Sequence, residues 1–307
     1  MKKFIEKIIA ILCFCFSFVF IFCACRHENE NDGGVLNKNI KIITTIFPQY
    51  DFVKQLTKDV DDVEVLMLSS PGVDVHCFEP SPKDIKNIKS ADMFIYVGGK
   101  NDSWVEKILN SVDGKKNKTV SLFEILKDRK NLKDEHVWTS VLNCIKIVEF
   151  LGEKLCEIDE NNKEKYLKNT REYVEKLKEL DKEFRDVASN KKRDFVVFAD
   201  KFPFTYLFED YGIDALKAFH NCSSKSEVSS FEIAKIIEKA KANKVKFILK
   251  TEGTTDDSVA KTIAGETGAK ILTLNSCHTC SKKDFENGKT FLEFYRENLK
   301  TLKEALN

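Results

Sequence analysis

The feature that most constrains the fold of this chain is a regular alternation of short apolar runs with amphipathic helix signals. The segments between the runs carry apolar residues at three- and four-residue steps, which is the period of a helix. Strands that alternate with helices favour parallel sheets covered by helices on both faces. The sequence therefore predicts an α/β fold. The apolar runs lie at residues 40–45, 63–68, 92–99, 119–122, 195–199, 245–249 and 270–274.

A long helix signal divides these runs into two groups. It extends from about Lys163 to Val187, with lysines and glutamates on the faces that are not apolar. A helix of about 25 residues is about 37 Å long, which is more than one small lobe needs. Its apolar seam covers too few heptads for a coiled coil. We therefore expect an N-terminal α/β lobe at 40–155, a rigid linking helix within 156–192, and a C-terminal α/β lobe at 193–307.

The chain is expected to close with one helix, from about Phe285 to Leu306. The preceding strand, 270–274, leads into the loop that contains His278. In parallel α/β sheets, ligands bind beyond the carboxyl ends of the strands. His76 also follows an apolar run, 63–68, in a loop punctuated by glycine and proline. Both histidines are thus predicted to lie at binding edges of the two sheets.

The first 25 residues have the composition of an export signal. A basic start is followed by almost entirely apolar sequence from Ile8 to Ala24, and the chain becomes polar directly after Cys25. Ala24-Cys25 resembles the cleavage site of bacterial lipoproteins, with Cys23 as a competing position; an uncleaved membrane anchor is the alternative. We predict a lipoprotein signal peptide at 1–25, a polar tether at 26–39, and an extracytoplasmic body attached to the cell membrane through a lipid on Cys25.

Charge and histidine content limit the classes of function. The chain has 50 Lys and Arg residues against 49 Asp and Glu residues. Its formal net charge of +1 is too small to attract nucleic acid. Neutral imidazoles are good ligands for zinc. A single histidine is more often an inert surface residue, and only the presence of further histidines in similar motifs favours a metal site. The five histidines from which such a site must be drawn are His27, His76, His136, His220 and His278.

Several motifs, in the order in which they occur here, resemble the metal-binding lipoproteins that supply zinc or manganese to ABC-type importers. The resemblance covers nearly all of the chain after the signal peptide. It implies two lobes with a metal site in the cleft between them, His76 and His136 as the first two metal ligands, and a permease and an ATPase as membrane partners. The motifs are Thr44–Tyr50, Pro71–Ser81, Ala91–Gly99, Asp134–Trp138 and Glu266–Lys270.

The third ligand is where this chain departs from the family pattern. The family usually has a histidine or glutamate at the start of the second lobe, where Ala199 stands here and cannot bind metal. A late aspartate of the family is replaced in Leu274-Asn275-Ser276. We predict His278, beside the replaced aspartate, as the third ligand. His220 is the rival, and Cys277 and Cys222 are lesser candidates.

Cys277 and Cys280 form a CxxC pair around His278, and its role stays open between a redox pair, a structural disulfide and metal ligands. Three imidazoles favour Zn²⁺ over Mn²⁺, because manganese sites prefer carboxylates. An exported zinc hydrolase is a rival function, but the chain has neither an HExxH nor a GxSxG motif, so we predict no enzyme. A surface adhesin with a structural metal is a second alternative.

Overall fold

The computed structural model describes residues 39–73, 78–99, 102–110, 119–219, 228–254 and 256–307. These residues form two four-stranded sheets in which every strand pair is parallel. The predicted α/β class with two parallel sheets is therefore confirmed. Among the described helices, none has both the length and the apolar character that a membrane span requires.

The first sheet has the strand order β2-β1-β3-β4. Successive residues of β1 point to opposite faces: Ile42 belongs to a core with Phe52, whereas Ile43 packs in a second core with Val105. Helices therefore cover both faces, as predicted. The strands are β1 (Ile40–Thr44), β2 (Val63–Met67), β3 (Met93–Tyr96) and β4 (Thr119–Ser121). The helices that follow them are α2 (Phe47–Leu56), α3 (Pro82–Ser90), α4 (Ser103–Asn110) and the short α5 (Leu122–Ile125).

The second sheet repeats this arrangement with the order β6-β5-β7-β8. Val197 of β5 packs with Ile236 and Ile263 on one face, while Phe198 enters the core on the other face. The strands are β5 (Phe195–Phe198), β6 (Asp214–Lys217), β7 (Phe247–Thr251) and β8 (Lys270–Leu274). The helices are α8 (Thr205–Tyr211), α9 (Ser230–Ala242), α10 (Ser258–Thr267), α11 (Lys282–Glu286) and α12 (Phe291–Ala305).

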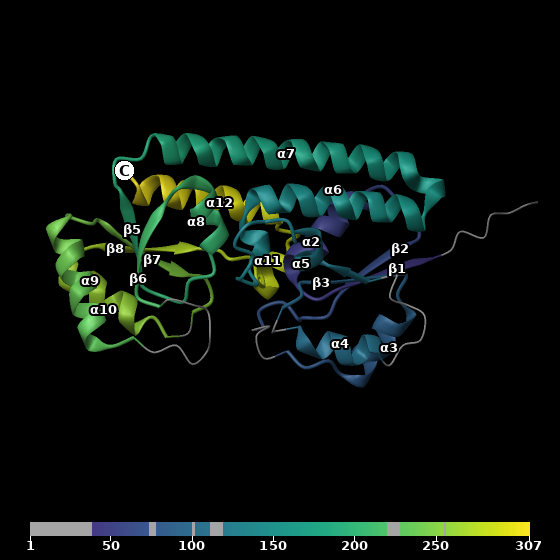
Figure 1. Ribbon diagram of the computed structural model, residues 1–307, viewed down its shortest axis with the longest axis horizontal. Coiled ribbons are helices and arrows are strands. Elements are labelled where there is room, and N and C mark those ends of the chain that lie inside the picture. The colour runs from purple at the N-terminus through teal and green to yellow at the C-terminus, as the bar shows by residue number, and fades with distance from the viewer. Residues whose placement is uncertain (1–38, 74–77, 100–101, 111–118, 220–227, 255) are drawn as a thin grey trace, which may run out of the picture. The chain divides into compact units, whose positions relative to one another are not determined.

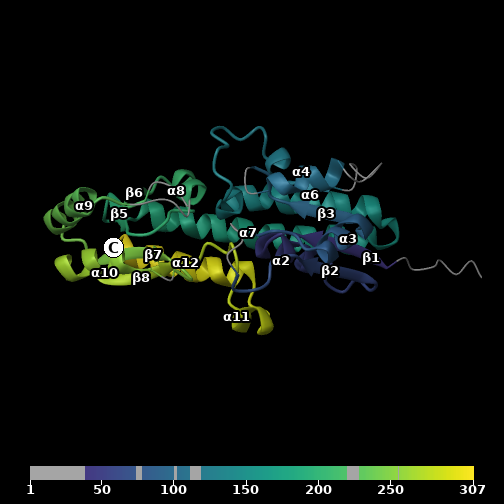
Figure 2. The same ribbon diagram turned by 90° about the horizontal axis from the view of Figure 1, so that it is seen from below.

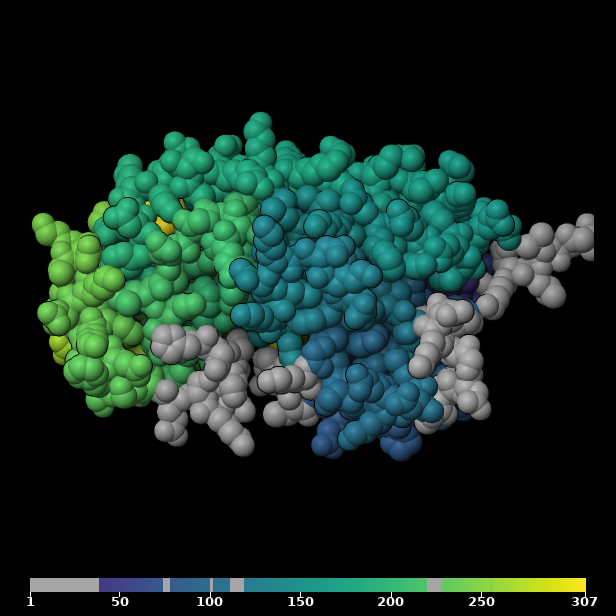
Figure 3. Space-filling model, in the orientation of Figure 1, coloured from purple at the N-terminus to yellow at the C-terminus, as the bar shows by residue number. Residues whose placement is uncertain are grey.

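The long helix α7 (Lys163–Ser189) runs past both sheets (Figures 1 and 2). It packs against α2 and α6 (Val141–Ile158) beside the first sheet, and against α8 and α12 beside the second. On the face shown in Figure 3, its residues border both the blue-teal first half and the green second half. One apolar core includes Ile42 of β1, Leu177 of α7 and Phe198 of β5. Because this core is continuous, the proposed lobe boundaries at 155 and 193 stay a prediction.

The buried carboxylate of Asp51 also joins the halves. It accepts hydrogen bonds from the Tyr173 hydroxyl on α7 at 3.2 Å and from the Phe291 backbone N–H of α12 at 3.1 Å. Burial raises the pKa of Asp51 to about 6, despite these hydrogen bonds and one from Gln55. The start of the last helix is thus attached to α2 and α7.

The prediction of one closing helix from about Phe285 to Leu306 is wrong. The segment forms α11 and α12, separated by Gly288 in the left-handed conformation (φ 69°). Thr290 then caps α12, since its hydroxyl accepts from the Glu293 N–H and the Glu293 carboxylate accepts from the Thr290 N–H. Strand β6 is absent from the apolar runs predicted above, because it has only two apolar residues, Ala215 and Leu216, between two charged ones.

Candidate functional site

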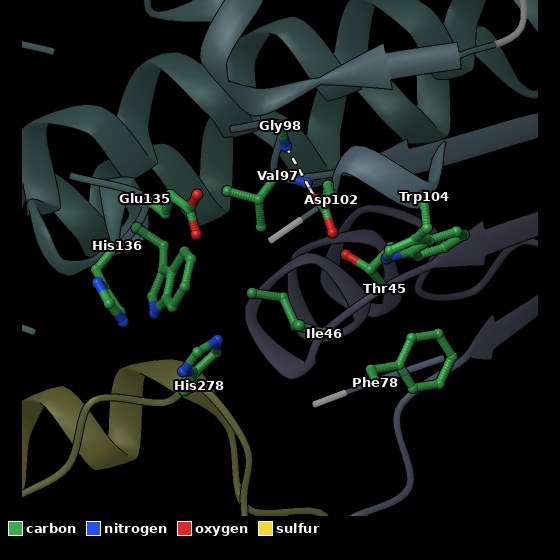
Figure 4. A pocket seen from close by; sticks show the side chains of 11 residues that line it. Thr45, Ile46, Phe78, Val97, Gly98, Asp102, Trp104, Glu135, His136 and His278 are labelled. Atoms are coloured by element: carbon green, nitrogen blue, oxygen red, sulfur yellow. Dashed lines mark hydrogen bonds between the residues drawn. The ribbon is translucent and has the colours of Figure 1, made fainter. Parts of the chain in front are cut away.

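A small cavity lies at the carboxyl ends of strands from both sheets (Figure 4). Its volume is about 30 Å³, which is the space of one water molecule or one ion. Sites for organic ligands usually measure about 300–1,000 Å³, so this cavity suits a far smaller solute. The described residues that line it are Thr45, Ile46, Phe78, Val97, Gly98, Asp102, Trp104, Glu135, His136, Trp138 and His278.

His136 is buried at the start of the short 3₁₀ helix η3 (Val137–Thr139). Its Nδ1 atom lies 2.6 Å from Oδ1 of Asp134, and its backbone N–H donates to the same oxygen at 2.9 Å. Burial raises the pKa of Asp134, but the hydrogen bond and charge of His136 outweigh it and hold that pKa below its usual range. Asp134 therefore orients the ring through Nδ1, and the opposite side of the ring faces the cavity in Figure 4.

His278 lies in the loop that follows β8. Ser276 supports this loop, because its hydroxyl accepts from the His278 N–H at 3.2 Å. Ser276 in turn donates to the half-buried carboxylate of Glu252 through its N–H and its hydroxyl, both at 2.7 Å. Burial raises the pKa of Glu252 to about 7, against the lowering effect of these two hydrogen bonds. The position of His278 thus depends on a residue at the end of the neighbouring strand β7.

The two imidazoles lie next to each other although they come from distant parts of the chain. Their ring centroids are 5.1 Å apart, with an interplanar angle of 79°. The Trp138 ring lies 5.3 Å from the ring of His136 and 5.1 Å from that of His278. In Figure 4 both imidazoles lie beside the same space. The structure therefore brings together two of the three predicted metal ligands.

Two carboxylates line the same cavity. Asp102 accepts hydrogen bonds from the Val97 and Gly98 backbone N–H groups at 2.8 and 2.9 Å. Burial and, to a smaller extent, the charge of Glu135 raise its pKa to about 6 against these bonds. Glu135 lies so close to Gly99 (φ 90°) that a Cβ atom there would be 2.8 Å from its Oε1. Glycine at this position therefore allows the carboxylate to approach the cavity.

The remaining predicted residues divide into two groups. Within the described ranges, Ala199 is buried, and the side chain of Asn275 bonds within its own loop, since Asn275 Oδ1 accepts from the Cys277 N–H at 2.8 Å. The described residues contain no group of three or more His, Cys, Asp and Glu side chains placed to hold a metal ion. The predicted residues that lie outside the described ranges are Cys25, His27, His76, His220 and Cys222.

Cys277 and Cys280 are buried and carry free thiols. Burial raises the pKa of Cys280 to about 12 and that of Cys277 well above its usual value. A reactive redox cysteine needs a low pKa and exposure to its partners. The redox interpretation of the CxxC pair therefore has no support in these surroundings, and neither cysteine is among the residues that line the cavity.

Sequence reasoning did not identify the roles of Asp102, Asp134 and Trp138. Asp134 and Trp138 belong to the motif around His136, so their position was visible but their contacts were not. The signal for Asp102 is its place directly before α4, four residues after Gly98. A carboxylate there can accept hydrogen bonds from the backbone N–H groups of the preceding turn.

A family model described as ZnuA, zinc-uptake complex component A, periplasmic, matches residues 42–305. The high-affinity zinc uptake system protein ZnuA of Bacillus subtilis is 33% identical, and the match covers 87% of this chain and 88% of that protein. The zinc-binding lipoprotein AdcA of Streptococcus pneumoniae is 31% identical over 87% of this chain. This chain spans 56% of the length of AdcA, so it corresponds to only part of that protein.

Solved structures agree with these relatives. The Zn(II)-bound ZnuA-like domain of S. pneumoniae AdcA is similar with a TM-score of 0.73 and 31% identity, over 87% of this chain and 99% of that domain. The laminin-binding protein Lmb of Streptococcus agalactiae, described as a bifunctional protein with adhesin and metal-transporting activity, has a TM-score of 0.71 and 26% identity, over 87% of this chain and all of the Lmb chain. The resemblance drawn from the motifs is confirmed, and this chain belongs to the ZnuA family of zinc-uptake components.

Proposed function

We propose that this protein captures Zn²⁺ outside the cytoplasm and delivers it to an ABC-type importer. The observation that carries the proposal is the pair of imidazoles, His136 and His278, 5.1 Å apart beside a cavity of about 30 Å³. Zinc is bound by imidazole nitrogen at about 2.0–2.1 Å, so two rings at a tetrahedral angle around one ion have centroids about 5 Å apart. The observed separation agrees with two ligands of one ion.

His76 is the proposed third ligand. It lies outside the described residues, and the motif that it shares with the family and the contacts of its described neighbours support the assignment. Phe78 lines the cavity, and the Gly72 N–H donates at 3.0 Å to the hydroxyl of Thr279, the residue after His278. A tetrahedral zinc ion needs four donors. Water or the carboxylate of Glu135 would complete the set.

Zinc is preferred over manganese because of the chemistry of these donors. Imidazole nitrogen suits zinc, whereas manganese favours carboxylate, carbonyl and water oxygens. The carboxylates that line the cavity do not outnumber the proposed imidazoles, and Asp102 is committed to two backbone N–H groups. The names of the relatives ZnuA and AdcA also support zinc.

Tethering and membrane partners complete the proposal. A lipid on Cys25 would hold the body at the outer face of the cell membrane, where a permease with its ATPase receives the ion. A family of zinc-uptake components has no need of turnover, so we propose that this chain is not an enzyme. Adhesion is a second candidate role, favoured by the similarity to Lmb, which is described as both adhesin and metal transporter.

Metal titration of the soluble body, from Arg26 onward, tests the function. We expect one equivalent of Zn²⁺ to bind, to outcompete Mn²⁺, and to remain bound in a mixture of the two. Preferential retention of Mn²⁺, or no retention of either ion, would contradict the proposal. Deleting the gene should create a requirement for added zinc, whereas a protein acting only as an adhesin would leave growth in low zinc unchanged. The zinc-loaded protein should show no hydrolytic turnover.

A further inference from the structure

Residues in the second half of the chain hold the segment that carries His136. The carboxylate of Asp134 uses Oδ1 for the ring and backbone of His136, as described above. Its other oxygen, Oδ2, accepts a hydrogen bond from the hydroxyl of Thr205 at 2.8 Å. Thr205 is the first residue of α8, which follows β5 of the second sheet. A hydroxyl of the second half therefore contacts the carboxylate that orients a proposed ligand.

Tyr206, the next residue of α8, holds the backbone of the same segment. Its hydroxyl accepts from the N–H groups of Lys133 and Asp134 at 2.9 and 2.8 Å, and it donates to the Asp134 carbonyl oxygen at 2.9 Å. One phenol oxygen thus uses its donor and both acceptor positions on two consecutive residues. The ring is fully buried beneath the guanidinium of Arg129, which lies 4.6 Å from its centroid.

Polar contacts of Arg129 and Asp210 support the base of this arrangement. Arg129 forms an ion pair of 2.7 Å with Asp210 of α8, and both side chains are largely buried. Asp210 also accepts a hydrogen bond from the hydroxyl of Ser140, which caps α6. Residues 129–140 are therefore attached to both ends of α8, so a shift of α8 would move Asp134 with it.

We infer that α8 is the positioning element for His136, with the Thr205 hydroxyl fixing the Asp134 carboxylate and the Tyr206 hydroxyl fixing its backbone. This inference rests on the proposed function, in which His136 is a zinc ligand. Groups that orient a metal-binding histidine through its other ring nitrogen commonly change metal affinity by about 10- to 100-fold when they are removed. Through this contact, the second half of the chain sets the ring orientation of a ligand in the first half.

Thr205→Val and Tyr206→Phe test the inference, because each removes one hydroxyl and keeps the shape of the side chain. We expect each to weaken Zn²⁺ binding by about 10- to 100-fold. Thr205→Ser keeps the hydroxyl and should bind zinc like the parent. Tyr211→Phe is the matched control on the same helix: its hydroxyl donates to Asp181 at 2.9 Å, away from the cavity, so its loss should lower the melting temperature without changing zinc affinity.

A second measurement does not depend on zinc. In the metal-free protein, the ¹⁵N chemical shifts of the His136 imidazole report the state of Nδ1, and they should change in Thr205→Val but not in Tyr211→Phe. If Thr205→Val and Tyr206→Phe both bind zinc like the parent while His136→Ala does not, α8 has no positioning role and the proposed function stands. If the parent itself does not bind zinc, the proposed function fails, and unchanged imidazole shifts in Thr205→Val would overturn the inference as well.

Discussion

The indole Nε1 of Trp138 donates a hydrogen bond of 2.8 Å to the carbonyl oxygen of Ser276. Trp138 lies two residues after His136, and Ser276 lies two residues before His278. The indole is almost fully buried, and the backbone carbonyl oxygen of Trp138 accepts a hydrogen bond from the Cys144 thiol at 3.0 Å. This contact joins the loop after β8 to η3, close to both imidazoles.

The histidines give the most direct prediction. His76→Ala, His136→Ala and His278→Ala should each weaken Zn²⁺ binding by orders of magnitude, because each removes one proposed ligand. His220→Ala and His27→Ala are the matched controls and should bind like the parent. Calorimetric titration measures all five. If His278→Ala retains zinc while His220→Ala loses it, the third ligand is misassigned although the transport proposal remains.

Zinc affinity should depend steeply on pH. An imidazole must be neutral to bind a metal ion, and the reference pKa of a free imidazole is about 6.5. Protons therefore compete with zinc below neutral pH, so affinity should fall as the pH decreases from about 7 to about 5. Competition titrations with a chelator of known affinity at each pH measure this. Constant affinity over that range would indicate that carboxylates, and not imidazoles, hold the ion.

Glu252 should lower the stability of the parent at neutral pH. Its pKa is raised from 4.5 to about 7 in the folded protein, so folding favours its protonated form. The contribution of Glu252 to the free energy of unfolding is most favourable below about pH 4.5 and is lost as the pH rises toward about 7. Glu252→Gln removes this titration, and the variant should gain stability relative to the parent by about 3 kcal/mol between those limits.

Urea unfolding of both proteins at pH 4.5, 6 and 7.5 checks this prediction. Glu266→Gln is the control for the loss of one negative charge, since Glu266 is exposed. A constant difference between parent and Glu252→Gln at all three values would show that Glu252 ionises with an ordinary pKa.

The Arg129–Asp210 ion pair should be important for stability. Its side chains are 15% and 10% exposed, so Asp210→Asn leaves a largely buried guanidinium with only the more distant and more exposed Glu209 carboxylate, at 3.9 Å, as a partner charge. Breaking such a pair typically costs about 3–5 kcal/mol, whereas an exposed pair contributes below about 1 kcal/mol. Denaturant unfolding should therefore show a large loss for Asp210→Asn and a small one for Glu266→Gln. Equally small losses of stability in Asp210→Asn and Glu266→Gln would show that solvent reaches the Arg129 guanidinium.

The lipid tether is tested by Cys25→Ser. Lipid attachment needs the thiol, so the variant should be released from the membrane fraction once its signal peptide has been removed. Immunoblots of membrane and soluble fractions, with mass spectrometry of the N-terminus, measure both events. Cys23→Ser is the matched control and should remain membrane-bound. A processed Cys25→Ser protein that stays with the membrane would show that lipidation does not occur at this residue.

Local sequence patterns by themselves determined the fold class of this protein. The apolar runs and the three- and four-residue steps of 163–187 are properties of neighbouring residues, and they identified two parallel sheets and α7. The pattern failed at Gly288, because the apolar residues on both sides still have a helical period. It marks β6 only weakly, because the two apolar residues of this strand stand between Asp214 and Lys217 and none of the four is fully buried.

Part of the candidate site also followed from the sequence. Strands of a parallel sheet end at the same edge, so a histidine directly after β8 was expected near a binding site. Only the tertiary structure decided that its ring lies 5.1 Å from that of His136 and that Trp138 joins the two. The contacts of Asp134 with Thr205 and Tyr206 were also decided by the tertiary structure alone. They depend on how α8 packs against a segment far away in the chain, and no local periodicity encodes that packing.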